Sequence, residues 1–148
     1  MRLDVLLVED SPGDVRLTQE VFRDANMSAH LPNMAIHLHV ASDGVEAMAF
    51  LHRKGENETA PRPDLILLDL NLPRMDGRQV LEAIKSDPEL ASIPVVVLTT
   101  SENEDDVLHS YSLHANAYVT KPVDFQRFIE VIRQIDDFFV TVVRLPRR

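Results

Sequence analysis

Short, nearly continuous apolar runs alternate with segments of helical periodicity along this chain, and that alternation limits the fold more than any other feature. Three runs are rich in branched residues and almost free of polar breaks, as expected of strands buried on both faces: Leu3 to Val8, Leu65 to Leu68 and Val95 to Leu98. Ile36 to Val40 alternates apolar and polar residues, which predicts a half-exposed strand near a sheet edge. Ala117 to Val119 predicts a short fifth strand.

Helical patterns fill the intervals between these runs and follow the last one. Two of them begin with residues at the spacing of a capping box, Asp43 with Glu46 and Ser101 with Glu104. Strands that alternate with helices favour an α/β fold, in which a doubly wound, five-stranded parallel sheet is covered on both faces as a three-layer sandwich. We expect residues 1–148 to form one domain.

Charge and composition exclude several classes of protein. The chain carries a net charge of −9, which disfavours direct binding to the phosphates of nucleic acids. No apolar run approaches the length of about 20 residues that a membrane span needs, and the first residues do not read as a signal peptide. Cysteine is absent, so disulfides and thiolate metal sites are excluded. We expect a cytoplasmic protein.

Reactive side chains collect where the apolar runs end. In chain order, Glu9 and Asp10 follow the first predicted strand, Asp69 the third and Thr99 the fourth, and Lys121 comes shortly after the fifth. The carboxyl ends of parallel strands lie at one edge of a sheet, where doubly wound folds bind their ligands. We therefore expect three carboxylates, a hydroxyl and an ammonium group to meet there.

Three carboxylates that lie close together need a cation or a proton. Two unit charges about 4 Å apart repel by about 4 kcal/mol at an effective dielectric constant of about 20. No histidine or cysteine occurs in these segments, so the ligands are oxygens, which favours Mg²⁺ or Mn²⁺ over zinc. A carboxylate beside Mg²⁺ and the Lys121 ammonium can act as a nucleophile towards phosphorus.

Five segments resemble, in the same order, the signature segments of bacterial response-regulator receiver domains: Val8-Glu9-Asp10, Leu67 to Pro73, Met75-Asp76-Gly77, Leu98-Thr99 and Tyr118 to Pro122. The resemblance runs from Leu3 to about Phe139 and implies a flavodoxin-like sheet with strand order 2-1-3-4-5. Three segments resemble the stand-alone regulators of bacterial phytochromes, which implies a light-sensing histidine kinase as partner: Glu9 to Leu17, Ile93 to Ser101 and Phe138 to Pro146.

The resemblance assigns a phosphoacceptor and a metal site. Asp69 would accept the phosphoryl group. Asp10 and Asp69 would bind Mg²⁺ through their side chains, the carbonyl of Asn71 would be a third ligand, and Glu9 would act through a metal-bound water.

It also assigns the residues that respond to the phosphate. Lys121 would contact the phosphoryl group, Thr99 would turn inward to hydrogen-bond it, and Tyr118 would move with Thr99. Asn71 and Ser101 would set how fast water removes the phosphate.

The last helical segment carries a second apolar row, formed by Val131, Ile135, Phe138 and Val142. One row packs on the sheet, and a second is surplus unless something covers it. We therefore predict a homodimer through this helix and the tail. We expect residues 140–148 to form a C-terminal extension without an output domain, so the message would pass by contact, for example to a downstream phosphotransfer protein.

Other classes of protein also use such a sheet. A Mg²⁺-dependent phosphohydrolase with an aspartyl nucleophile usually has a second acid two residues later, where this chain has Asn71. We therefore expect this protein to catalyse only its own phosphorylation and slow dephosphorylation. A flavin-binding module would want a phosphate loop where Glu9 and Asp10 stand, and an adaptor independent of phosphorylation would not need the full set of site residues. His37 and His39 share a strand face, which we read as an exposed edge rather than a metal site.

Overall fold

The computed structural model describes residues 2–26, 35–70, 72, 75–99 and 117–120. Its elements, in chain order, are β1 (Arg2–Val8), α1 (Pro12–Asn26), β2 (Ala35–Ala41), α2 (Gly44–Leu51), a 3-10 turn η1 (Gly55–Asn57), β3 (Leu65–Asp69), α3 (Gly77–Ser86), β4 (Val95–Thr99) and β5 (Ala117–Thr120). The two further helices expected near the C-terminus lie outside the described residues. None of the described helices has the length and apolar character needed to cross a membrane.

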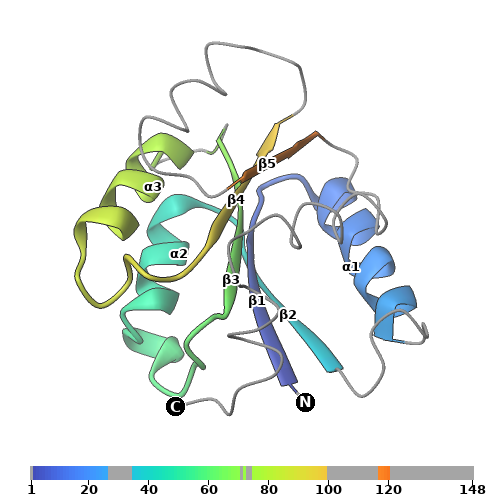
Figure 1. The fold of residues 1–148 in the computed structure, drawn as a ribbon, viewed down its shortest axis with the longest axis horizontal. Coiled ribbons are helices and arrows are strands. Elements are labelled where there is room, and N and C mark those ends of the chain that lie inside the picture. The colour runs from blue at the N-terminus through green and yellow to red at the C-terminus, as the bar shows by residue number, and fades with distance from the viewer. Residues whose placement is uncertain (1, 27–34, 71, 73–74, 100–116, 121–148) are drawn as a thin grey trace.

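The strands form one parallel sheet in the order β2-β1-β3-β4-β5, which confirms the predicted topology. Helix α1 covers one face of the sheet, and α2 and α3 cover the other (Figure 1). The predicted three-layer α/β sandwich is therefore confirmed. β1 lies between β2 and β3, so the strand order reverses between β1 and β3. Doubly wound folds bind their ligands at this reversal.

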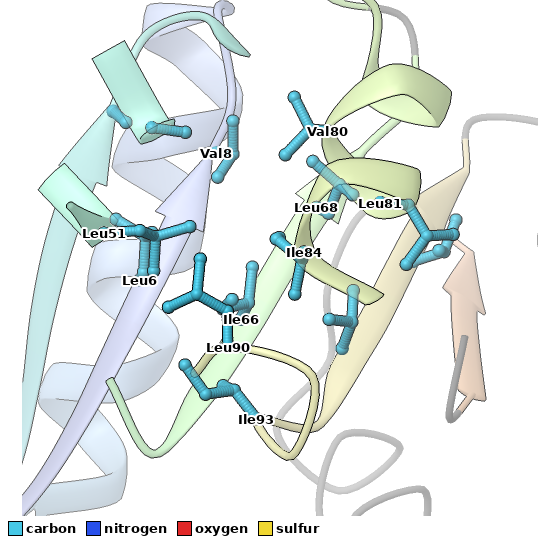
Figure 2. Packing of buried hydrophobic residues seen from close by; sticks show 14 of the residues in the cluster. Leu6, Val8, Leu51, Ile66, Leu68, Val80, Leu81, Ile84, Leu90 and Ile93 are labelled. Atoms are coloured by element: carbon cyan, nitrogen blue, oxygen red, sulfur yellow. The ribbon is translucent and has the colours of Figure 1, made fainter. Parts of the chain in front are cut away.

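Burial on both faces explains why the central strands are so apolar. Every residue of β3 is buried, and so are Leu3 to Val8 of β1. On the α2–α3 side, Leu6 and Ile66 of the sheet belong to one cluster with Val80 and Ile84 of α3 (Figure 2). Burying a side chain of this size contributes about 1.5–3 kcal/mol, so these strands anchor the edge that carries the candidate site.

The edge strand β2 differs in one respect from the prediction. His37 is exposed, but the His39 side chain is only 23% exposed, so the prediction of an exposed face is wrong for His39. Its Nε2 lies 2.9 Å from Oδ1 of Asp4, whose side chain is 2% exposed, and its ring centroid lies 5.4 Å from that of Phe50. The reason is that α2 covers this face of the strand.

Both helices on that face begin with a capping residue. At α2, Asp43 accepts a hydrogen bond from the backbone N of Glu46 at 2.8 Å, as the spacing predicts, while the Glu46 carboxylate accepts from the hydroxyl of Ser42 at 2.6 Å. At α3, Asp76 and Gln79 form a full capping box. Such caps typically contribute about 1 kcal/mol each and fix where the helix starts.

Candidate metal and phosphoacceptor site

The ends of β1 and β3 bring three acidic residues together. Val8 pairs with Leu68 across the two strands, so the residues that follow them leave the sheet side by side. Glu9, Asp10 and Asp69 each offer a carboxylate oxygen, and these oxygens all lie within 4.8 Å of one another. The three carboxylates that we expected at the strand ends therefore do lie close together.

The three carboxylates differ in their exposure. Glu9 and Asp69 are only 2% and 3% exposed, whereas Asp10 is exposed at the rim. The backbone N of Glu9 donates to the carbonyl of Ala41 at 3.0 Å, which ties the end of β1 to β2, and the Glu9 carboxylate accepts from the backbone N of Ser11 at 3.4 Å. The cluster therefore combines two buried carboxylates with one that solvent can reach.

The spacing within the cluster fits a divalent cation bound through oxygens. Charges 4.8 Å apart repel by about 3.5 kcal/mol per pair at an effective dielectric constant of about 20, so three of them favour a bound cation. Oxygens bound directly to one Mg²⁺ lie at most about 4.2 Å apart, because its ligands are at about 2.1 Å. The cluster is therefore of the right size for one Mg²⁺: either a small side-chain adjustment brings all three oxygens within reach of the ion, or one of them binds it through water. Glu9, Asp10 and Asp69 would hold the ion.

A glycine shapes the loop that leaves Asp69. The backbone N of Gly77 donates to the carbonyl of Leu70 at 3.1 Å, and a Cβ at position 77 would lie 2.3 Å from the carbonyl oxygen of Asp69. Real Cβ atoms essentially never come closer than 3.0 Å to another atom, so no side chain fits there. Together with the Asp76 cap, this contact closes the loop on itself directly after the candidate phosphoacceptor.

The capping box that starts α3 was missed in the sequence analysis. Asp76 and Gln79 stand at capping-box spacing, and that signal could have identified Asp76 as the start of α3 rather than only as part of a motif. Asp14 lies in the first turn of α1, where an acid is favoured by the helix dipole.

The backbone places the end of β4 at the same edge as the acidic cluster. Asp69 pairs with Leu98, and Thr99 pairs with Thr120, the residue that precedes Lys121 in the sequence. The side chains of Thr99 and Tyr118 lie outside the part of the chain that the structure describes. So do the remaining predicted residues: Asn71, Ser101, Lys121, Val131, Ile135, Phe138 and Val142.

Comparisons with known proteins identify the family to which the chain belongs. The profile of the response regulator receiver domain matches residues 5–133. The response regulator Rcp1 of Synechocystis sp. is 50% identical over 142 residues, which make up 96% of this chain and 92% of that protein.

Two solved structures extend the likeness to the fold. The Mn²⁺-bound form of Rcp1 matches with a TM-score of 0.74 at 49% identity, covering 98% of this chain and 99% of the other. The phosphorylated cyanobacterial phytochrome response regulator RcpA matches with a TM-score of 0.77 at 46% identity, covering 99% and 100% of the two chains. With its parallel sheet and acidic edge, the chain therefore belongs to the response regulator receiver domain family, which works in two-component phosphorelay signalling.

Proposed function

We propose that Asp69 is the residue that accepts the phosphoryl group in this chain. The observation that carries the proposal is the cluster of Glu9, Asp10 and Asp69, with all three oxygens within 4.8 Å at the carboxyl edge of the sheet. Asp69 is the member that ends the central strand β3, which fixes its backbone, and its buried carboxylate has an oxygen within 4.8 Å of an oxygen of the exposed Asp10.

The transfer itself needs little from the protein beyond alignment and charge. One carboxylate oxygen of Asp69 attacks phosphorus, a new P–O bond forms, and the bond from phosphorus to the imidazole nitrogen of the donor breaks, with its electron pair leaving on the donor. A bound Mg²⁺ would supply positive charge that offsets the carboxylates and the phosphoryl oxygens. We propose Mg²⁺ as the resident ion and Mn²⁺ as a substitute, since the related Rcp1 was solved with Mn²⁺.

We assign the response to the phosphate to residues near the end of β4 and after β5. In this proposal Lys121 pairs with a phosphoryl oxygen, Thr99 hydrogen-bonds it, and Tyr118 follows Thr99. Asn71 and Ser101 set the rate at which water removes the phosphate. The support is that these positions lie within the range matched by the receiver-domain profile, residues 5–133, and that Thr99 pairs with Thr120 at the site edge.

A sensor histidine kinase is the partner implied by the family, and we propose that it is a light-sensing phytochrome kinase. The support is the 46% identity to RcpA, itself a phytochrome response regulator. The protein would then work in the cytoplasm, where such kinases draw on ATP. Residues 1–148 would act as one receiver unit that passes its message by protein contact, to a downstream phosphotransfer protein or to a second copy.

The second copy would bind through the row formed by Val131, Ile135, Phe138 and Val142, with residues 140–148 as an extension of that surface. A measurement of molecular mass in solution tests this part separately. The wild type should be a dimer, and Ile135→Glu with Phe138→Glu should be a monomer that still accepts phosphate. A monomeric wild type would remove the dimer from the proposal and leave the phosphoacceptor untouched.

Phosphotransfer from a kinase tests the central proposal. A phytochrome-type histidine kinase carrying labelled phosphate is mixed with the wild type and with Asp69→Asn. Label should pass to the wild type in the presence of Mg²⁺ and not to Asp69→Asn, and Lys121→Ala should still be labelled but lose the change in partner affinity. Labelling of Asp69→Asn at the wild-type rate would refute the assignment of Asp69.

An enzyme with an aspartyl nucleophile makes a different prediction. With a simple phosphoester and Mg²⁺, a hydrolase releases many equivalents of phosphate, whereas a switch acquires at most one covalent equivalent. We expect no sustained turnover, because residue 71 is an asparagine and not a second acid. Steady multiple turnover that is lost in Asp69→Asn would favour the hydrolase.

A further inference from the structure

Helix α2 approaches the loop after Asp69 backbone to backbone. Gly44, the first residue of α2, is buried, and a Cβ built there would lie 2.4 Å from the carbonyl oxygen of Met75 and 2.6 Å from its Cβ. It would also lie 2.7 Å from a methyl group of Val80. The Val80 side chain could adjust, but the Met75 carbonyl belongs to the main chain. Glycine is therefore required at position 44 by lack of space.

Met75 lies in the loop that joins Asp69 to α3, and this loop is fixed at two points. Near α3 it is closed by the contact of Gly77 with Leu70 and with the carbonyl of Asp69. Before that point it rests on α2 through Met75. Met75 lies two residues before Gly77, so a shift of Met75 reaches the backbone of the candidate phosphoacceptor through the contact of Gly77 with Asp69 and Leu70.

The helix is the firmer of the two partners in this contact. Ala47 and Leu51 of α2 are buried in the main apolar cluster, while Met75 is only partly buried at its margin. The start of α2 is also held by the Asp43 cap and by the hydrogen bonds of Glu46 to Ser42. Figure 2 shows Val80 on the side of α3 that faces Val8. Its methyl group closes the space that a Cβ at position 44 would need. An added methyl group would therefore displace the loop rather than the helix.

We propose that Gly44 is a positioning residue for the phosphoacceptor site: its contact with Met75 sets how Gly77 lies against the backbone of Asp69, and with it cation affinity and the rate of phosphorylation. The inference rests on the proposed function of Asp69. Restoring a normal contact needs a shift of at least about 0.6 Å, since real Cβ atoms keep at least 3.0 Å. Misplacements of about 1 Å can lower a rate about 100-fold, so we expect about a tenfold loss here.

The test compares Gly44→Ala with Gly13→Ala. Both add one methyl group, but a Cβ at Gly13 meets only the hydroxyl of Ser11 at 4.0 Å, so Gly13→Ala is a matched control. Three quantities are measured on each folded protein: the Kd for Mg²⁺ alone by calorimetry, the initial rate of phosphorylation by acetyl phosphate, and the free energy of unfolding. A merely structural glycine would change the third quantity and leave the first two unchanged.

A second pair of variants separates the loop from the core. Val80→Ala in the Gly44→Ala background relieves the side-chain contact but not the contact with the Met75 carbonyl, so the rate should stay about tenfold low. Met75→Ala removes a side chain that packs the loop against the core without adding any atom, and it should raise the Kd for Mg²⁺ in the same direction. This variant decides the matter if Gly44→Ala does not fold.

The outcomes are distinct. If Gly44→Ala folds, a wild-type Kd for Mg²⁺ and a wild-type rate of phosphorylation would overturn this inference and leave the proposed function intact. Recovery of both quantities when Val80→Ala is added would do the same. If Gly44→Ala does not fold, wild-type Mg²⁺ binding by Met75→Ala would overturn it. A wild type that neither takes up Mg²⁺ nor accepts phosphate would instead overturn the proposed function, and this inference with it.

Discussion

Replacing Asp10 with asparagine should stabilise the metal-free protein, which is the reverse of the usual effect of altering a site residue. Asp10 lies with Glu9 and Asp69 in the acidic cluster, and it is exposed, so Asp10→Asn removes one charge without opening a cavity. The stability increases because, without a cation, the charge of Asp10 only repels the other two carboxylates and so lowers the free energy of unfolding.

The magnitude follows from the spacing of at most 4.8 Å. Each of the two repulsions lies between about 0.9 kcal/mol at the dielectric constant of water and about 3.5 kcal/mol at a value of about 20. Because Asp10 is exposed and screened by solvent, we expect the lower part of this range, a gain of about 1–2 kcal/mol in the free energy of unfolding.

The same substitution should cancel the stabilisation by Mg²⁺. A cation that binds only the folded state stabilises the wild type by about 1.4 kcal/mol at ten times its Kd. Asp10→Asn lacks one ligand and should gain much less, so the difference between the two proteins should shrink or reverse when Mg²⁺ replaces a chelator.

Urea unfolding with EDTA and then with Mg²⁺ measures both effects. Glu58→Gln is the control, because it removes one charge from an exposed residue outside the cluster and reports the effect of net charge alone. The reasoning is refuted if Asp10→Asn is less stable than the wild type in EDTA, or if Mg²⁺ stabilises both proteins equally.

Three further predictions concern groups away from the cluster. In a double-mutant cycle, Asp4→Ala and His39→Ala should show a coupling of about 1.5–3 kcal/mol in urea unfolding, because the 2.9 Å contact joins a buried carboxylate to an imidazole, and additive effects would contradict it. Asp76→Ala should lower the free energy of unfolding by about 1 kcal/mol through loss of the α3 cap, while Asp76→Ser retains most of it; equal losses would speak against capping. Burial lowers the pKa of Lys85 below 10.5, so the folded chain binds fewer protons than the unfolded one just below that pH, and the contribution of Lys85 to stability rises with pH there. Lys85→Met should flatten the rise just below pH 10.5, and exposed Lys54→Met should not; an unchanged slope in Lys85→Met would count against this account.

The fold could be predicted because central parallel strands are buried on both faces and therefore appear as apolar runs. The acidic cluster could be predicted for a related reason, since residues that follow parallel strands share one edge of the sheet. Glu9, Asp10 and Asp69 needed no knowledge of side-chain packing to be brought together. Strand order did not follow from periodicity, and its prediction depended on the resemblance to receiver domains.

Contacts between elements could not be predicted in this way. Asp4 interrupts an apolar run, and its partner His39 lies 35 residues further along, so no local pattern links them. Gly44 looks like an ordinary helix start, because periodicity reports which face of a helix is apolar and not how closely another backbone approaches it. Such features depend on tertiary distances, which a single sequence does not contain.

The most direct test of the central claim is the mass of the intact protein after incubation with acetyl phosphate, with and without Mg²⁺. The account predicts a gain of one phosphoryl group that requires Mg²⁺, is lost under alkaline conditions as an acyl phosphate should be, and is absent from Asp69→Asn. An unmodified wild type in the presence of Mg²⁺, or an equal gain in Asp69→Asn, would contradict it.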